Sequence, residues 1–394
     1  MNLAHTYSWV EVSRRELIAN IRAHRRLIGR KVKLMAVVKS NAYGHGIELV
    51  SQVAQASSQV DWLGTASLTE AKTIRRAKVK LPILVLSFFR PFVPDDLVWA
   101  IKNKISFMVY EPEQLEALIK AASKAKRPAW VHLKLETGMA RLGLMPKDAR
   151  AFLKRILASH HLKLEGIASH FATAEAKDQA FLKKQLGAYR RFVRTVDPPL
   201  AATVLQHMAC SAAITAAPTT HLSLVRLGIA LYGLWPSAEN KQLVRKLRPD
   251  FELKPALIWK TQVVEAQRLA KGTPVGYARH YITRRAITMA VLPVGYWDGY
   301  GRGLSNRGVV LIRGVRCPII GNVCMNISMV DASAVPKVRA GDEAVLIGKQ
   351  GRPRSAGAGQ DKGEVTADRL AELTHTINYE VVTRINPLLP RILL

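Results

Sequence analysis

The order of apolar and amphipathic segments constrains the fold of this chain more than any single residue does. Short apolar runs of strand length recur through the first two thirds of the 394 residues, and amphipathic helix-like stretches separate them. The eight strand candidates are residues 34–38, 61–65, 82–86, 106–110, 130–135, 164–169, 203–208 and 224–230. Eight strands that alternate with helices predict a (β/α)8 barrel of the TIM type.

The pattern changes in the last third of the chain. The barrel helices are expected at residues 15–27, 112–125, 147–158 and 177–196. After about residue 245, alternating β-branched runs such as 256–266 and 287–294 predict a second, mainly β domain. We therefore expect a barrel domain over residues 10–245 and a mainly β domain over residues 246–394, with which residues 1–9 would pair. A glycine-rich stretch, 349–363, predicts a flexible loop.

Lys39 ends the first apolar run and precedes a turn that contains Tyr43 and Gly44-His45-Gly46. Side chains at the C-terminal ends of barrel strands project into the active-site pocket. A lysine that is partly desolvated there has a lowered pKa and is a better nucleophile. A surface lysine is the usual interpretation of such a position, but the hydroxyl and free amides of this turn favour a lysine that anchors an aldehyde cofactor.

Other candidate site residues fall toward the same end of the predicted strands. They lie in, end or follow strands five to eight, and they are Lys134, Arg141, His170, His207, Ser211, Arg226, Gly228 and Ile229. Because the carboxyl ends of barrel strands meet at one face, we expect these residues to form one site. Each histidine taken alone would more often be a structural residue.

Composition limits the class of protein. The three cysteines are too few for a disulfide framework and indicate a reducing compartment. Residues 1–11 lack an apolar signal region, and the longest apolar stretch, 81–89, is too short to span a bilayer, so we expect a cytoplasmic protein without a membrane partner. The formal charge of +30 raises the alternative of a nucleic-acid partner. However, the basic residues are scattered as on solvated helix faces, so no specific nucleic acid is expected.

Several segments together resemble the alanine racemase family. In chain order they are residues 37–46, 135–143, 169–174, 226–234, 275–277, 295–300, 321–326 and 378–380. Each segment alone is a weak signal, but eight in the family's order are specific. The resemblance implies a pyridoxal-phosphate enzyme that interconverts L- and D-alanine for peptidoglycan synthesis, with no metal site.

The resemblance also assigns roles to residues. An amino-acid racemase needs one acid/base group on each face of a planar intermediate, and these would be Lys39, which also holds the cofactor as a Schiff base, and Tyr277. Arg226 would face the pyridine nitrogen, with His170 and His207 orienting it. The other cofactor contacts would be Tyr43, Ser211, Gly228, Ile229 and Tyr379. The substrate contacts would be Arg141, Met325, Tyr296 and Lys134.

Two further expectations follow from the family. Lys134 matches a lysine that some members carry as a carbamate beside the arginine, and an ordinary ion pair is the alternative. The family's counterparts of Tyr277, Tyr296, Met325 and Arg302 reach the cofactor of the partner subunit. The resemblance therefore implies a head-to-tail homodimer with shared active sites.

Four positions depart from the family's pattern. Cys210 replaces an asparagine, Glu175 with Ala176 replaces an acidic pair, Asn322 replaces a basic residue and Asn326 replaces an aspartate. They predict either no functional change or a relaxed selectivity toward larger or basic amino acids such as lysine, arginine or serine. A pyridoxal-phosphate decarboxylase of the same architecture and a non-catalytic cofactor carrier are the remaining alternatives, and the Tyr277 segment favours a racemase.

Overall fold

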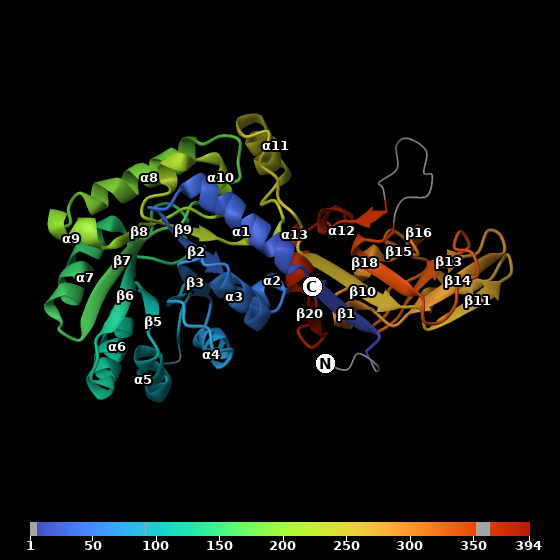
Figure 1. Cartoon of the computed structure of the whole chain (residues 1–394), viewed down its shortest axis with the longest axis horizontal. Coiled ribbons are helices and arrows are strands. Elements are labelled where there is room, and N and C mark those ends of the chain that lie inside the picture. The colour runs from blue at the N-terminus through green and yellow to red at the C-terminus, as the bar shows by residue number, and fades with distance from the viewer. Residues whose placement is uncertain (1–5, 91, 352–362) are drawn as a thin grey trace. The chain divides into compact units, whose positions relative to one another are not determined.

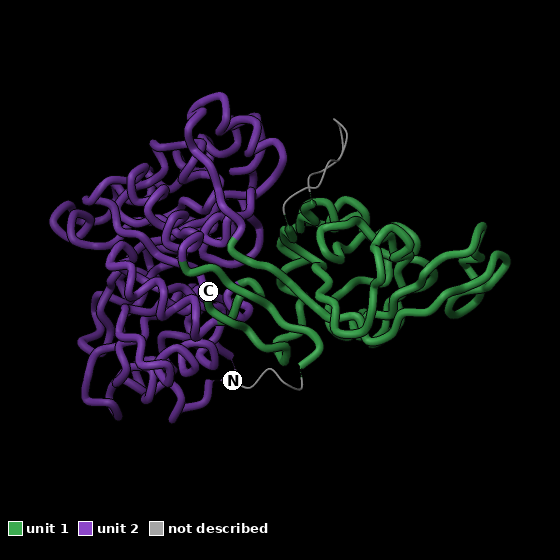
Figure 2. Tube along the Cα trace, turned by 45° about the vertical axis from the view of Figure 1, so that its right-hand side comes forward, with its two compact units in different colours: residues 1–14, 43–46, 256–394 green, residues 15–42, 47–255 purple. Residues whose placement is uncertain are grey.

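The computed structural model describes residues 6–90, 92–351 and 363–394. It divides the chain into two compact units (Figure 2). The barrel unit contains residues 15–42 and 47–255, and the β unit contains residues 43–46, 256–394 and the described part of 1–14. The division at Pro255/Ala256 follows the end of α11 (Ala238–Leu247), within which the expected boundary at residue 245 falls. Most of the loop expected at 349–363 lies outside the described residues.

The barrel unit is built on an eight-stranded parallel sheet with the order β8-β7-β6-β5-β4-β3-β2-β9. Its strands are β2 (Lys33–Val37), β3 (Trp62–Thr65), β4 (Ile83–Val85), β5 (Ile105–Val109), β6 (Ala129–Lys134), β7 (Leu162–Ala168), β8 (Leu205–His207) and β9 (Leu224–Leu227). Every predicted strand overlaps one of them. The predicted (β/α)8 architecture is therefore confirmed.

Helices follow the strands around this sheet (Figure 1). They are α1 (Arg14–Ile28), α2 (Lys39–Tyr43), α3 (Ile47–Ala56), α4 (Leu68–Arg76), α5 (Pro94–Lys102), α6 (Pro112–Ala125), α7 (Pro146–Ala158), α8 (Ala180–Val193), α9 (Pro198–Thr203), α10 (Ser211–Ala216) and α11. Proline occupies the first position of α5, α6 and α7, where its missing N–H breaks no helical hydrogen bond. The expected helix at 177–196 begins later, at Ala180.

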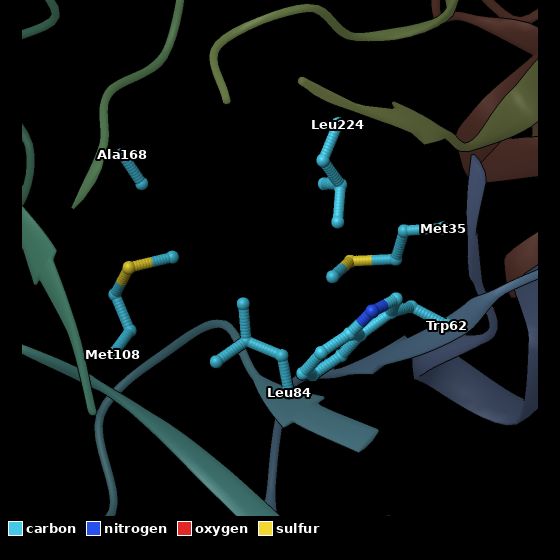
Figure 3. Close-up of a cluster of buried hydrophobic side chains, with 6 residues drawn as sticks. All are labelled: Met35, Trp62, Leu84, Met108, Ala168 and Leu224. Carbon is cyan, nitrogen blue, oxygen red and sulfur yellow. The ribbon is translucent and has the colours of Figure 1, made fainter. Parts of the chain in front are cut away.

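The interior of the barrel is filled by large apolar side chains from different strands. Figure 3 shows Met35, Trp62, Leu84, Met108, Ala168 and Leu224 directed toward one another. Each is at most 7% exposed. Burial of a large apolar side chain stabilises a fold by about 1.5–3 kcal/mol, so this cluster is a substantial part of the core that holds the strand ends in place.

The β unit is mainly β, as predicted. Its largest sheet has the order β16-β15-β18-β10-β1-β20, with β19 paired to β18. β1 (Ser8–Val12) is antiparallel to β10 (Leu257–Gln262) and parallel to β20 (Arg391–Leu393). The N-terminal strand therefore joins sequence ends that lie far apart in the chain.

Smaller elements complete the β unit. The rest of the large sheet is β15 (Val309–Ile312), β16 (Val315–Pro318), β18 (Glu343–Lys349) and β19 (Glu364–Val365). Two smaller sheets contain β11 (Glu265–Leu269), β14 (Ile287–Leu292) and β17 (Ser328–Asp331), and β12 (Pro274–Val275) and β13 (Tyr281–Ile282). The helices are α12 (Ala367–Leu373) and α13 (Asn378–Thr383). None of the helices in the described part of the chain is long and apolar enough to cross a membrane.

Candidate active site

Lys39 lies two residues beyond the end of β2 and begins the segment labelled α2, whose backbone is a left-handed turn and not a regular α-helix. Ser40, Asn41, Ala42 and Tyr43 have φ values of 55°, 53°, 53° and 52°. A left-handed conformation costs a non-glycine residue about 1–2 kcal/mol, so backbone strain is concentrated at this position. Strain of this kind persists where the surroundings hold it and is frequent at functional sites.

A carboxylate that the sequence analysis did not single out holds this turn. Glu70 of α4 accepts hydrogen bonds from the backbone N–H of Ser40 at 2.6 Å and of Ala66 at 2.7 Å. The same segment caps α4, because the Ser67 hydroxyl accepts from the Glu70 N–H. The spacing Ser67-x-x-Glu70 is a capping-box signature, and it is the feature of the sequence that could have singled out Glu70.

Lys39 lies in a cluster of cations from different strand ends. Its pKa is lowered, first by desolvation and then by the positive charge of Arg141, against an opposing effect of Glu70. Burial lowers the pKa of Lys134 to about 8, and the charges of Arg226, Arg141 and Lys39 contribute to that shift. The barrel thus brings these four cationic side chains within electrostatic reach of one another, an arrangement that favours an anionic ligand.

Arg226 of β9 is buried and fixed by acceptors. Its Nη1 donates to His207 Nδ1 at 2.6 Å and to the His207 carbonyl at 3.1 Å. Its Nη2 donates to His170 Nδ1 at 3.0 Å and to the Ser169 and Met208 carbonyls at 2.7 and 2.9 Å. Desolvation lowers the pKa of Arg226 only to about 10, so the guanidinium keeps its charge at neutral pH.

Both histidines beside Arg226 are neutral. Burial, followed by the charge of Arg226, lowers the pKa of His170 and of His207 well below its ordinary value. Each ring therefore offers an unprotonated Nδ1 to the guanidinium. The Arg226 guanidinium is therefore held in one plane as a hydrogen-bond donor, and it keeps its protons at neutral pH.

A second set of polar contacts in the barrel unit joins the Ser211 hydroxyl to the backbone that follows β9. Ser211 at the start of α10 accepts hydrogen bonds from the N–H groups of Gly228 at 2.9 Å and Ala230 at 3.3 Å. Gly228 precedes the 3-10 helix Ile229–Tyr232. The Tyr232 hydroxyl donates to the Val37 carbonyl at 2.8 Å and ties this helix to β2, two residues before Lys39.

Tyr277, Tyr296 and Met325 of the β unit lie in neighbouring segments that are joined by hydrogen bonds. The Asn322 side chain donates to the Tyr277 carbonyl at 3.0 Å, and the Tyr296 N–H donates to the Cys324 carbonyl at 3.0 Å. A Cβ at Gly295 would overlap that same carbonyl oxygen, so the close approach requires glycine. Tyr277, Met325 and Tyr296 are 72%, 56% and 43% exposed.

The predicted site residues thus fall into two groups. Those of the barrel unit are Lys39, Lys134, Arg141, His170, His207, Ser211, Arg226, Gly228 and Ile229. Those of the β unit are Tyr43, Tyr277, Tyr296, Met325 and Tyr379. Within the β unit the rings of Tyr43 and Tyr379 lie 6.1 Å apart, centroid to centroid.

The departures from the family's pattern have ordinary structural environments. Cys210 precedes α10, and burial raises the pKa of its thiol. Burial also raises the pKa of Glu175. Asn322 is only 6% exposed and hydrogen-bonds within the Tyr277 segment. Asn326 is exposed.

Comparison with known proteins identifies the family. Residues 12–236 match the family described as Alanine racemase, N-terminal domain, and residues 256–393 match Alanine racemase, C-terminal domain. The chain belongs to the alanine racemase family. It is therefore an enzyme of the isomerase class, as the resemblance implied.

Relatives of the family are similar over nearly the whole chain. Alanine racemase of Symbiobacterium thermophilum is 38% identical over 384 residues, and that of Halothermothrix orenii is 36% identical over 385 residues. Each of these matches covers 98% of this chain and 96% of the relative.

Solved structures are similar to the same extent. Alanine racemase of Clostridium difficile 630 matches with a TM-score of 0.88 and 30% identity, covering 99% of this chain and 96% of that one. Alanine racemase from a D-cycloserine-producing Streptomyces lavendulae matches with a TM-score of 0.86 and 34% identity, covering 99% and 97%.

Proposed function

We propose that this enzyme interconverts L-alanine and D-alanine with pyridoxal 5'-phosphate as its cofactor. The observation that carries the proposal is the arrangement around Arg226. A buried guanidinium is fixed by two neutral histidines and lies in a cluster that includes Lys39, whose pKa is lowered. A rigid donor and a nucleophilic amine are the two groups that such a cofactor needs from the protein.

The predicted cofactor-binding residues have the chemistry that this cofactor needs. Lys39 would hold its aldehyde carbon covalently, and Arg226, oriented by His170 and His207, would donate to its ring nitrogen. Ser211, Gly228, Ile229 and Tyr43 would bind its phosphate through hydroxyl and backbone N–H donors, and Tyr379 would line the same site. When bound, the cofactor makes the α-proton of an amino acid acidic by delocalising the carbanion.

Two groups would move the proton. The Lys39 amine takes or returns it on the D-face of the substrate, and the Tyr277 hydroxyl takes or returns it on the L-face. Inversion requires this opposed placement, because a single base would return the proton to the face it left. The lowered pKa of Lys39 supports its role, since a larger fraction of the amine is unprotonated at neutral pH.

The substrate carboxylate would bind to Arg141 and to the backbone N–H of Met325, with Tyr296 at the entrance. The Arg141 guanidinium offers a bidentate fork for a carboxylate. Lys134 would position Arg141 if it carries a carbamate, and the alternative is an unmodified lysine that forms an ion pair with a carboxylate such as Glu136. The Lys134 pKa of about 8 supports the first form, because a carbamate arises only from a neutral amine.

The enzyme would work as a head-to-tail homodimer. Tyr277, Tyr296, Met325 and the Arg302 region of each subunit would complete the active site of the partner. The high exposure of Tyr277 and Met325 in a single chain supports this arrangement. The product D-alanine would serve peptidoglycan synthesis in the cytoplasm.

A broader substrate range is the second candidate. The observation that favours it is Asn322, an uncharged side chain that contacts the Tyr277 segment where the family has a basic residue. Loss of that positive charge would reduce the repulsion of a lysine or arginine side chain in the substrate.

Chiral analysis of the reaction products tests both candidates. The purified protein is incubated with L-alanine, L-serine, L-lysine or L-arginine, with and without added pyridoxal phosphate. We expect D-alanine to form, and D-lysine or D-arginine at a comparable rate would establish the broader range. Absence of every D-product would refute the proposal, and release of carbon dioxide would indicate a decarboxylase instead.

A further inference from the structure

The hydrogen bonds of Arg226 continue through the barrel to a carboxylate. His207, whose Nδ1 accepts from Arg226, lies with its Nε2 2.9 Å from His132 Nδ1. His132 Nε2 lies 3.2 Å from Glu165 Oε2, and the Ser106 hydroxyl donates to the same oxygen at 2.5 Å. We call the residues Arg226, His207, His132 and Glu165 the Glu165 chain. They belong to strands β9, β8, β6 and β7 of the barrel unit.

Only one assignment of donors and acceptors satisfies every hydrogen bond of the Glu165 chain. A guanidinium only donates, so His207 Nδ1 must accept and its proton must be on Nε2. That proton points to His132 Nδ1, which leaves the His132 proton on Nε2, directed to the Glu165 carboxylate. The chain therefore runs from a cation through two neutral imidazoles to an anion, with no member left unsatisfied.

The backbone is shaped to hold this chain. In the β6–β7 ladder Val131 pairs with Leu164 and His132 with Gly166, so Glu165 is the extra residue of a bulge. A bulge re-aims the side chain that it carries. A Cβ at Gly166 would overlap the His132 ring at Nδ1, and the Trp62 and His132 rings pack in a T-shaped geometry with their centroids 5.7 Å apart.

Charge explains why a carboxylate is useful at this distance from the site. Arg226 is buried, and the ionised groups that lower the pKa values around it are themselves cations, Lys134 and Arg141. A buried charge without compensation is costly. Glu165 supplies a negative charge. Because each neutral imidazole accepts a hydrogen bond at one nitrogen and donates one from the other, the Glu165 carboxylate favours the His207 tautomer that accepts from the Arg226 guanidinium.

We propose that Glu165 and His132 are positioning residues for Arg226, because they stabilise from the Nε2 side the His207 tautomer that accepts from Arg226 and so help to hold the guanidinium in one orientation. The inference rests on the proposed function only in that Arg226 would face the cofactor. Residues that orient a metal-ligating histidine from behind typically contribute about 10- to 100-fold to metal affinity or activity. We expect an effect of the same order here.

Three variants of this chain test the proposal. Glu165→Leu removes both the charge and the acceptor, and Glu165→Gln keeps an acceptor without the charge. The matched control is Glu48→Gln, which changes an exposed glutamate of α3 in the same unit. The readouts are the histidine tautomers, from long-range ¹H–¹⁵N NMR of histidine-labelled protein with and without pyridoxal phosphate, the kcat and KM in both directions, and the unfolding midpoint.

In the parent protein and in Glu48→Gln, His132 and His207 should each show a single tautomer with the proton on Nε2. Glu165→Leu should give mixed tautomers at His132, whose Nε2–H loses its acceptor, and a kcat lower by about 10-fold or more, with KM within about twofold. Glu165→Gln should keep the tautomers and recover part of the lost kcat, because its amide oxygen still accepts. Should Glu165→Leu fail to fold, the Gln variant decides the question.

Two outcomes would overturn the proposal. One is unchanged tautomers and kcat in Glu165→Leu. The other is a Gln variant that loses its Nε2–H tautomers or loses as much kcat as the Leu variant, since the acceptor would then have no orienting role. A parent protein that forms no D-alanine would refute the proposed function instead, and the tautomers measured without cofactor would still decide the role of the Glu165 chain.

Discussion

At the scale of single residues, the barrel unit combines a fixed cation with amines that are easily deprotonated. The described partners of Arg226 are acceptors, and its pKa of about 10 keeps it charged. Lys39 and Lys134, in contrast, have lowered pKa values because both are desolvated next to other cations. The positive electrostatic potential that would attract an anionic cofactor therefore also lowers the pKa values of the two lysines and increases the fraction of each that is a neutral amine.

Replacement of Lys39 tests the cofactor anchor. Lys39→Ala should abolish the visible absorbance of lysine-bound cofactor and lower turnover by about 10⁴-fold or more, because one variant removes both the anchor and a base. Absorbance spectra after addition and removal of pyridoxal phosphate measure the first effect. Lys31→Ala, at an exposed lysine just before β2, should change neither. A Lys39→Ala protein with full absorbance and activity would rule out the assignment.

Replacement of Tyr277 separates the two bases. Tyr277→Phe should keep the absorbance band but lose about 10²- to 10⁴-fold in turnover, mainly when L-alanine is the substrate. Exchange of the α-proton with deuterated water from each isomer measures this asymmetry. Tyr7→Phe, at an exposed tyrosine of the same unit, is the control. Equal rates from both isomers at the parent level would exclude Tyr277 as a base.

The lowered pKa of Lys134 predicts a pH-dependent stability. Its folded pKa of about 8 lies below the ordinary 10.5, so between these values the unfolded chain binds more protons and stability rises with pH. Lys134→Met should therefore stabilise the cofactor-free protein by up to about 3 kcal/mol at pH 7 and by about 1 kcal/mol less at pH 9. Urea unfolding at both pH values checks this, with Lys147→Met at an exposed lysine as the control. A gain independent of pH would contradict the lowered pKa.

At the scale of elements, the sequence predicted the features that depend on the spacing of apolar residues. Eight apolar runs with helix-like intervals predicted the eight parallel strands, and Lys39, His207 and Arg226 lie at or near the C-terminal ends of these strands. What could not be predicted depends on side-chain contacts across the barrel. His132 and Glu165 lie within strands, where nothing in the alternation of apolar residues distinguishes an inward-facing polar chain from a solvated face.

The turn after the 3-10 helix Ile229–Tyr232 is a second feature that only the structure makes clear. Gly233 has a φ of +81°, and a Cβ there would overlap the Lys254 carbonyl oxygen. Gly29 has a similar φ of +71° but has nothing within 4 Å of a Cβ. Gly29→Ala should therefore cost only the left-handed penalty of about 1–2 kcal/mol.

Gly233→Ala should cost clearly more than Gly29→Ala in the free energy of unfolding, because the backbone must also move. The movement would displace the helix that carries Ile229 and follows Gly228, so the affinity for pyridoxal phosphate should fall as well. Denaturant unfolding and cofactor titration of both variants measure these effects. Equal losses of stability would mean that the turn can shift away from Lys254 without cost.

At the scale of the whole molecule, the two groups of predicted site residues lie in different units, and the question is which subunit supplies Tyr277 to a given Lys39. A closed dimer with two-fold symmetry can exchange such residues between its two sites. If the sites are shared, a dimer of one Lys39→Ala subunit and one Tyr277→Phe subunit contains one doubly altered site and one fully intact site. If each site belongs to one subunit, the same dimer contains no intact site.

Co-refolding of the two inactive variants in equal amounts distinguishes these arrangements. Random association makes about half of the dimers mixed, and one of two sites in each would be intact, so activity should return to about a quarter of the parent level. Each variant refolded alone is the control and should remain inactive. Light scattering would verify that the mixture is dimeric. A mixed dimer without activity would mean that Lys39 and Tyr277 act within one chain, and it would exclude the partner subunit as the source of Tyr277.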